Sequence, residues 1–299
     1  MGTLWGIDLG GTKIEGVVLP DALSTEPICR MRVPTEAENG YDHVLGQIAR
    51  LVDLMRSEVG SGPEAIGFGT PGVTDPKSGR LKNSNTQALN GMLLRDDLSD
   101  KLGVQAVLAN DANCFALAEA TYGAGKGAGT VFGVIMGTGV GGGIVIDGKI
   151  IGGAQGIAGE WGHNVLDPDG EYCSCGKRGC VETVLSGPAL ERFYRRRSGR
   201  SLRLPEIVEL ARAKEDESAI ETLDRLISLV GQGLSVVVNI LDPDVIVLGG
   251  GVGNVAELYS AGSESLARWV FNDSLQTKVV RPLLGDSAGV FGAAQLVAL

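Results

Sequence analysis

Positive charge is scarce in this sequence. Its 26 lysines and arginines stand against 36 aspartates and glutamates, which leaves a net charge of −10. A surface that binds nucleic acid or an anionic membrane needs the opposite sign, so we predict neither as a partner. The chain also lacks a basic segment followed by an apolar one at its start. We therefore expect no signal peptide and a cytoplasmic protein.

Long apolar runs without glycine are absent as well. The one stretch of 20 residues without charge is Gly127–Ile146, and eight of its residues are glycine. Glycine at that density is typical of turns between strands, so we interpret the stretch as strand, loop and strand and predict no membrane span. No low-complexity linker is present.

Cysteines are few and odd in number, so the five of them cannot all form disulfides. Three cluster within eight residues, which without an export signal favours a metal site over a disulfide framework. Glycine, in contrast, is abundant, with 46 residues. A match to any single glycine motif is therefore weak evidence by itself.

The length of 299 residues is near the limit of a single hydrophobic core, so we expect two domains. The pattern of apolar segments predicts an α/β protein. We assign residues 1–120 to an N-terminal α/β domain and 121–287 to a C-terminal α/β domain with an irregular loop at 160–182. Each half opens with a strand, a glycine turn and a second strand.

A polar pair, Asn110-Asp111, lies between an apolar segment that predicts a strand and a helical pattern. Ligands of open α/β sheets bind at such strand ends. A carboxylate at this place can accept the proton of a substrate hydroxyl, so Asp111 is our candidate for the catalytic base. The alternative is that Asp111 only caps the helix, since aspartate is a preferred cap residue.

Three glycine-rich turns follow predicted strands, and they have the composition of phosphate sites. Glycines let backbone N–H groups approach an anion, and hydroxyl and ammonium groups add further donors. The turn at Gly137–Gly142 matches the dinucleotide pattern G-x-G-x-x-G, but we reject the match because the β-branched run Ile144–Ile146 follows instead of a helix, and the turn at Gly10–Lys13 lacks the Walker A spacing. The alternative is that they are ordinary hairpin turns. The candidate nucleotide-binding residues are Asp8, which would hold Mg²⁺ through water, Gly10, Gly11, Thr12, Lys13, Gly137, Thr138, Gly139, Gly249, Gly250 and Gly251.

One histidine and three cysteines offer the Cys₃His ligand set of a structural zinc site: His163, Cys173, Cys175 and Cys180. A disulfide or three unrelated thiols are the alternatives. Two acids, Glu160 and Glu182, flank the same loop. Carboxylates suit a polyol ligand because they accept hydrogen bonds from neighbouring hydroxyls, although solvated surface acids would look the same.

Taken together, these segments resemble the ROK family of sugar kinases and repressors. The matching motifs are Asp8-Leu9-Gly10-Gly11-Thr12-Lys13, Gly69-Thr70-Pro71-Gly72, Asn110-Asp111-Ala112-Asn113, Gly137-Thr138-Gly139-Val140-Gly141-Gly142, Gly159-Glu160-Trp161-Gly162-His163, the run Cys173 to Glu182, and Leu248-Gly249-Gly250-Gly251. The His…Cys-x-Cys-Gly-x-x-Gly-Cys-x-Glu pattern is highly specific to the family.

The resemblance implies an actin-like, RNase H-like ATPase fold with ATP and Mg²⁺ bound between two α/β domains, and a homodimer. It implies that Asp111 is the base, that the Cys₃His set holds Zn²⁺ and that a final helix at about 288–299 returns to the first domain. His163 would serve both the ion and the sugar. The implied sugar-binding residues are Gly69, Thr70, Asn83, Asn85, Asn110, Asp111, Glu160, His163 and Glu182.

Within the family, the segment Lys82–Gly91 looks most like the fructokinase and mannokinase branch, although Ala88 stands where an aromatic residue is often found. The sequence thus predicts an ATP-dependent kinase for the 6-hydroxyl of fructose or mannose. The alternatives are an N-acetylglucosamine, N-acetylmannosamine or glucose kinase. Two alternatives from other classes are a sugar-sensing transcriptional repressor and an actin-like assembly protein. The repressor would need a DNA-binding segment before the first strand. The sugar-type loop and the cysteine cluster argue against the assembly protein.

Overall fold

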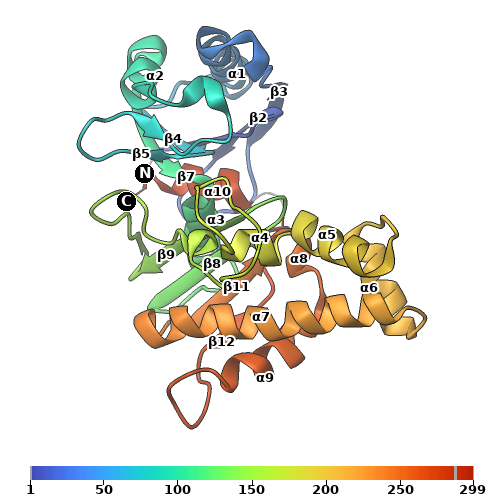
Figure 1. The fold of residues 1–299 in the computed structure, drawn as a ribbon. Helices are drawn as coiled ribbons and strands as arrows, with labels where there is room; N and C mark the ends of the chain where they lie inside the picture. Colours follow the sequence, from blue (N-terminus) through green and yellow to red (C-terminus); the bar gives the residue numbers. More distant parts are fainter. Residues whose placement is uncertain (1, 286–287, 299) are drawn as a thin grey trace. The chain divides into compact units, whose positions relative to one another are not determined.

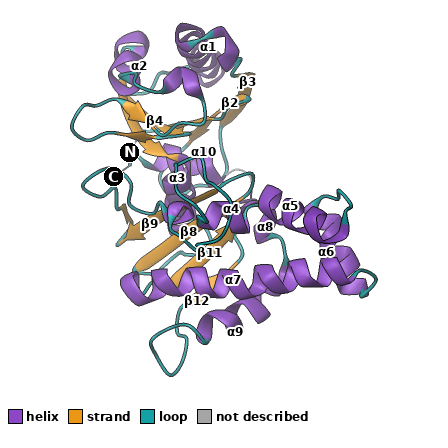
Figure 2. Cartoon of the chain, viewed as in Figure 1, coloured by secondary structure: helices purple, strands orange, loops and turns teal. Residues whose placement is uncertain are grey.

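A computed structural model describes residues 2–285 and 288–298. The chain divides into two compact units. The first takes the chain up to Lys126, then Gly143–Ala158, and the segment from Leu284 onward; the second takes Gly127–Gly142 and Gly159–Leu283. Both units combine strands and helices (Figure 2). The predicted boundary at residue 287 and the end of the predicted last helix at residue 299 lie outside the described residues.

The sheet of the first unit has the strand order β3-β2-β1-β4-β7. The first three strands are antiparallel, and β4 and β7 continue the sheet in parallel to β1. The bounds are β1 Leu4–Leu9, β2 Lys13–Leu19, β3 Cys29–Pro34, β4 Ala65–Thr70 and β7 Gln105–Asn110. The short strands β5 (Val73–Thr74) and β6 (Leu81–Lys82) form a separate pair. The predicted strand, glycine turn and strand at the start of this half are β1, its turn and β2, and the strand predicted before Asn110 is β7.

Helices cover both faces of this sheet (Figure 1). Successive residues of β1 face opposite sides of the sheet, so each side can be followed along this strand. Ile7 pairs with Gly16, which lies against Met55 of α1 (Tyr41–Val59). The neighbouring Gly6 faces α10 (Ala288–Gln295), where an added Cβ would lie 2.4 Å from the Ala294 nitrogen. Helix α3 (Asp111–Thr121) packs beside α10, and α2 (Leu94–Leu102) packs against β7. The missing glycine side chains allow α10 to approach the sheet backbone.

The second five-stranded sheet has the order β10-β9-β8-β11-β12. Its strands are β8 Thr130–Met136, β9 Val140–Ile146, β10 Lys149–Ile150, β11 Val245–Gly249 and β12 Lys278–Val280. The charge-free stretch thus forms a strand, a turn and a strand, as predicted. One of the boundaries between the two units falls within β9, after Gly142.

The helices of the second unit are α4 Val181–Leu185, α5 Gly187–Ser198, α6 Leu204–Ala213, α7 Glu217–Leu241, α8 Gly250–Gly253 and α9 Ala261–Ala267. The described residues also contain the 3₁₀ helices η1 Ala37–Asn39, η2 Gln87–Leu89, η3 Trp161–His163 and η4 Ala256–Tyr259. Among the described helices, only α7 is long and apolar enough to cross a bilayer by length and composition. It packs against α6 and α9, which are labelled beside it in Figure 1, and its buried face belongs to the core of this unit.

A buried carboxylate joins β2 to the edge strand β3. Glu15 is 3% exposed, and it accepts hydrogen bonds from Arg30 Nε at 2.6 Å and from Arg32 Nη2 at 3.0 Å. Desolvation favours the neutral acid, but the hydrogen bonds and charges of the two arginines outweigh it and hold the pKa of Glu15 below its ordinary value of 4.5. The ionised carboxylate therefore stabilises the folded state.

We expect Glu15→Gln to lower the free energy of unfolding at pH 7 by about 1–2 kcal/mol. The neutral amide leaves the partly exposed guanidinium groups of Arg30 and Arg32 without their buried carboxylate partner. Since the folded-state pKa is depressed, this stabilisation is present above pH 4.5 and fades as the pH falls through the lower folded value. Urea unfolding of both proteins between pH 7 and pH 3 measures it. Glu209→Gln, at an acid that is 72% exposed, is the control and should change little; equal effects at the two sites would contradict the account.

Candidate active site

The turn between β1 and β2 is held from outside by Thr35, which is fully buried. The Thr35 hydroxyl donates to the Gly10 carbonyl at 2.7 Å, and the Thr35 N–H donates to the Thr12 carbonyl at 3.0 Å. Within the turn, the Gly10 N–H donates to the Lys13 carbonyl at 3.0 Å. Three carbonyl oxygens of the turn are therefore bonded within the protein.

Two amides of the same turn point elsewhere. Gly11 and Thr12 are exposed, and their N–H groups have no hydrogen-bond partner in the described part of the chain. Free N–H groups beside an ammonium group form an anion site, and Lys13 supplies the ammonium, 3.6 Å from Glu15 Oε2. The sequence analysis missed Thr35. Only the pairing of β3 with β2 reveals its role, and no local motif marks it.

Asp8 is the last residue but one of β1, close to this turn and tightly surrounded by other residues. A Cβ added at Gly69 would lie 3.2 Å from one carboxylate oxygen, and one added at Gly289 would lie 3.3 Å from the other. Desolvation, followed by the charges of Asp111 and Glu15, raises the pKa of Asp8 to about 6, partly offset by Lys13. A divalent cation would relieve this repulsion, so Asp8 fits the predicted Mg²⁺ role, and its donor chemistry suits that ion.

Asp111 is the first residue of α3, directly after β7. The cap of this helix is Asn110, whose Oδ1 accepts from the Ala112 N–H at 2.9 Å; Asp111 Oδ1 accepts from the same group at 2.8 Å. Because Asn110 already caps the helix, capping alone does not account for Asp111. Its side chain is solvent-accessible, yet desolvation by the surrounding protein raises its pKa. A raised pKa makes this carboxylate a stronger base.

The remaining predicted sugar contacts of the first unit lie in different surroundings. Thr70 is buried, and its hydroxyl lies within hydrogen-bond distance of the Gly72 and Ala109 carbonyls, so it braces strand ends. Asn83 and Asn85 are exposed, and Asn83 has a φ of 58°, a left-handed value that asparagine tolerates. Their loop is fixed by Asn90, whose side chain bonds both backbone groups of Ser84 at 2.9 Å.

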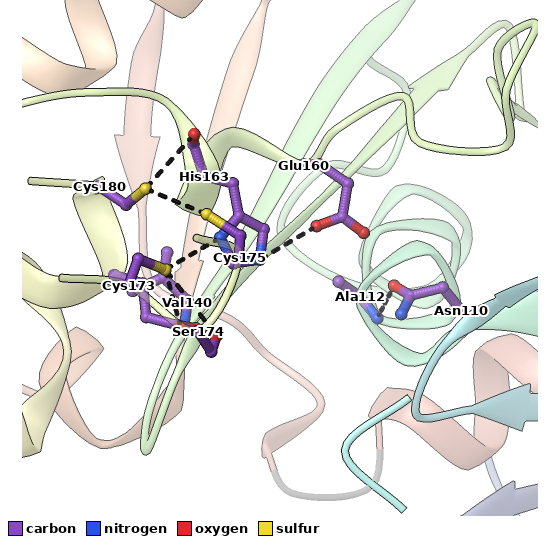
Figure 3. Close-up of polar contacts among 10 residues, drawn as sticks. Asn110, Ala112, Val140, Glu160, His163, Cys173, Ser174, Cys175 and Cys180 are labelled. Carbon is purple, nitrogen blue, oxygen red and sulfur yellow. Dashed lines mark hydrogen bonds and ion pairs between the residues drawn. The ribbon is translucent and has the colours of Figure 1, made fainter. Parts of the chain in front are cut away.

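The four predicted zinc ligands come together in the second unit (Figure 3). Their ligand atoms all lie within 4.8 Å of one another. Cys173 Sγ is 3.5 Å from His163 Nδ1, and Cys175 Sγ is 3.5 Å from Cys180 Sγ. A tetrahedral zinc ion with ordinary bond lengths separates sulfur and nitrogen by about 3.5 Å and two sulfurs by about 3.8 Å. The distances therefore fit Zn²⁺. All five cysteines are free, so no disulfide is present.

The backbone and the core position this cluster. Gly176 and Gly179 have φ values of 84° and 68°, which turn the loop back on itself. Trp161 is buried on the ring edge of Phe132, and its indole donates to the Gly233 carbonyl of α7 at 3.0 Å. This anchors η3 and with it His163. The ring presents Nδ1 to the cysteines and Nε2 to Glu160, 3.9 Å from its carboxylate, as expected for a histidine shared between ion and ligand.

The second glycine turn, between β8 and β9, resembles the first in having an internal hydrogen bond and two free amides. The Gly137 N–H donates to the Gly139 carbonyl, while the N–H groups of Thr138 and Gly139 have no partner among the described residues. The run Gly249–Gly251 passes from β11 into α8 beside it: Gly250 has a φ of 78°, and an added Cβ would lie 2.4 Å from the Met136 carbonyl. Glycine is required at this approach.

Comparison with known proteins agrees with the sequence motifs. The family model described as "ROK family" matches residues 4–299. The chain belongs to the ROK family. Curated relatives include the N-acetyl-D-glucosamine kinases of Aliivibrio salmonicida and Photobacterium profundum, at 36% and 35% identity, with 98% of both chains covered in each case.

Solved ROK structures give the fold. The ROK hexokinase of Thermus thermophilus aligns with a TM-score of 0.88 at 35% identity, covering 98% of this chain and 97% of its own. A ROK glucokinase of Streptomyces griseus, in complex with glucose and AMPPNP, aligns at 0.79 and 30% identity, covering 99% of each chain. The predicted actin-like ATPase fold is thereby confirmed. The curated relatives named above are N-acetylglucosamine kinases, whereas the sequence analysis favoured the fructokinase branch.

The bracing of the first turn predicts the effect of Thr35→Val. The variant keeps the shape of the side chain but frees the Gly10 carbonyl, so the turn amides lose their fixed direction. We expect the KM for ATP to rise about tenfold, in line with a lost buried hydrogen bond of about 1–2 kcal/mol, with a smaller change in kcat. Steady-state kinetics measure both.

Thr35→Ser keeps the hydroxyl and should restore the KM. Thr277→Val is the matched control, because the hydroxyl of Thr277 is also buried and donates to a carbonyl, that of Pro243, at 2.7 Å. A similar KM in Thr35→Val and in the control would mean that the turn does not depend on Thr35.

Proposed function

We propose that this protein is an ATP-dependent sugar kinase and that its preferred substrate is N-acetyl-D-glucosamine. The observation that carries the choice of sugar is the full-length similarity to N-acetylglucosamine kinases, at 36% identity over 98% of the chain. The activity is supported by the two glycine turns with free amides and by the solved glucokinase relative that holds glucose and an ATP analogue. This replaces fructose as the first choice, because the curated relatives favour the alternative.

Fructose and mannose remain among the sugars to be tested because the segment Lys82–Gly91 resembles the fructokinase and mannokinase branch. In the structure Asn90 Oδ1 accepts a hydrogen bond from the Ser84 N–H of this loop, and Ala88 is half-buried within it. The homodimer and the cytoplasmic location implied by the family stay predictions.

In the proposed reaction, positioning and charge neutralisation supply most of the rate enhancement. The amides of Gly11, Thr12, Thr138 and Gly139 hold phosphate oxygens. Mg²⁺ near Asp8 supplies positive charge to the phosphates when bound. Asp111 accepts the proton of the sugar hydroxyl as that oxygen attacks the γ-phosphorus, and the bond to the β–γ bridging oxygen breaks to release ADP.

The zinc loop has a separate task in this proposal. Zn²⁺ bound to the Cys₃His set would fold residues 160–182 and orient His163. The Nε2 of His163 and the carboxylate of Glu160 then face the sugar hydroxyls. Neither residue accepts the proton of the attacking hydroxyl, which passes to Asp111.

The test is a coupled assay of ADP release with the zinc-replete protein, Mg·ATP and separate sugars: N-acetylglucosamine, N-acetylmannosamine, glucose, mannose and fructose. We expect N-acetylglucosamine to give the highest kcat/KM. A higher value for fructose or mannose would overturn the sugar assignment and restore the interpretation of the Lys82–Gly91 loop. Binding of a sugar without turnover of any would contradict the kinase and favour a sugar-sensing role.

Asp111→Asn tests the proposed base. The amide keeps the size of the side chain and an oxygen for the Ala112 N–H, but it cannot accept the proton, so kcat should fall by at least about 100-fold while the fold and the affinity for nucleotide persist. Asp100→Asn, at an exposed aspartate on α2, is the control and should keep full activity. A folded Asp111→Asn protein with more than a tenth of normal kcat would remove Asp111 from this role.

A further inference from the structure

The second glycine turn is braced by the segment that carries the metal ligands. Glu182 lies on α4, two residues after Cys180, and its Oε2 accepts a hydrogen bond from the Val140 N–H at 2.9 Å. Its other oxygen lies 4.0 Å from Cys173 Sγ (Figure 3 shows Val140 beside the cluster). One side chain therefore contacts both the turn and the metal ligands.

Close contacts at two glycines also join the turn to the metal-ligand segment, one through a side chain and one through main chain. A Cβ at Gly139 would lie 2.5 Å from Glu182 Oε2. A Cβ at Gly162, the residue before His163, would lie 2.0 Å from the Val140 carbonyl. At Gly162 the metal-ligand segment therefore meets the main chain that follows the turn, with no side chain between them to absorb a shift.

A third contact lies just after α4. The Gly187 N–H donates to the Gly137 carbonyl at 2.9 Å. The start and the end of the turn are therefore both bonded to residues that follow Cys180 in the chain. These bonds occupy the backbone groups of Gly137 and Val140, so that the amides of Thr138 and Gly139 between them stay available.

We infer that the zinc loop controls nucleotide affinity at the second glycine turn through the hydrogen bond from Val140 to Glu182. This rests on the proposed function, in which the turn holds ATP phosphates. Glu182 is in this respect a positioning residue for the nucleotide, in addition to its predicted contact with sugar. Loss of the ordered loop releases Glu182 and the contact at Gly162, and the amides of Thr138 and Gly139 lose their common direction.

The consequence is testable without sugar and without turnover. The measurement is the Kd of Mg·ADP by titration calorimetry, for zinc-replete and chelator-treated protein and for variants at Glu182, with metal content and circular dichroism recorded on each sample. Glu182→Ala removes the acceptor, and we expect a Kd about tenfold higher at unchanged zinc content. Glu182→Gln keeps an acceptor oxygen and should bind Mg·ADP within about threefold of the wild type, since the neutral oxygen still bonds the Val140 N–H.

Zinc removal should weaken Mg·ADP binding at least as much as Glu182→Ala, because it releases both the Glu182 contact and the contact at Gly162, and its effect should be smaller in that variant, where the Glu182 contact is already lost. Asp169→Ala, at an exposed acid of the same loop, is the control and should bind normally. A Kd for zinc-loaded Glu182→Ala within twofold of the wild type overturns the inference, and this variant decides the matter if the chelated protein unfolds.

The two proposals fail in different ways. A wild-type protein that phosphorylates sugar but whose Mg·ADP affinity is unaffected by Glu182→Ala keeps the proposed function and loses this inference. A wild-type protein that neither binds Mg·ADP nor turns over contradicts the proposed function itself.

Discussion

A turn binds an anion on its amide hydrogens best when other hydrogen bonds hold its backbone in place. Both glycine turns are held in this way, and each by a different set of contacts. In the first turn, Thr35 donates hydrogen bonds to the carbonyls of Gly10 and Thr12. In the second, the Gly137 carbonyl accepts a hydrogen bond from the Gly187 N–H. Glu182 accepts one from the Val140 N–H, which holds the end of the turn in place. The proposed chemistry depends on these supports because free N–H groups without a fixed direction bind phosphate weakly.

Close main-chain approach is the second requirement of the fold, and it accounts for part of the high glycine content. Gly67 illustrates it, since an added Cβ would lie 1.8 Å from the Ala293 carbonyl of α10. Glycine in a strand costs conformational entropy, and the packing that its absence of side chain permits offsets that cost. The same approach at Gly162 brings the segment with His163 against the second turn.

The sequence was most informative where the physics is local. The Cys₃His set was found by spacing and ligand type, and the structure brings its four ligand atoms together. The strands around both glycine turns followed from short apolar runs bounded by glycine. The strand-to-helix position of Asp111 was also local, although the assignment of the cap to Asn110 required the hydrogen bonds.

The rest depends on contacts between distant segments, which no local pattern records. Thr35 acts on a turn more than 20 residues away because β3 pairs with β2. Glu182 was predicted as a sugar contact, and its bond to Val140 appears only once α4 is placed beside the turn. The choice of hexose was similarly beyond the motifs, since a single loop suggested fructose whereas relatives along the full chain favour N-acetylglucosamine.

The most direct test of the central claim is a backbone amide NMR titration of the zinc-replete protein with Mg·ADP. The account predicts that the amide signals of Gly11, Thr12, Thr138 and Gly139 show large shift changes at saturation, because these N–H groups gain phosphate partners. Saturating nucleotide that shifts other amides and leaves these four unchanged would contradict it, and would mean that the glycine turns are ordinary hairpins.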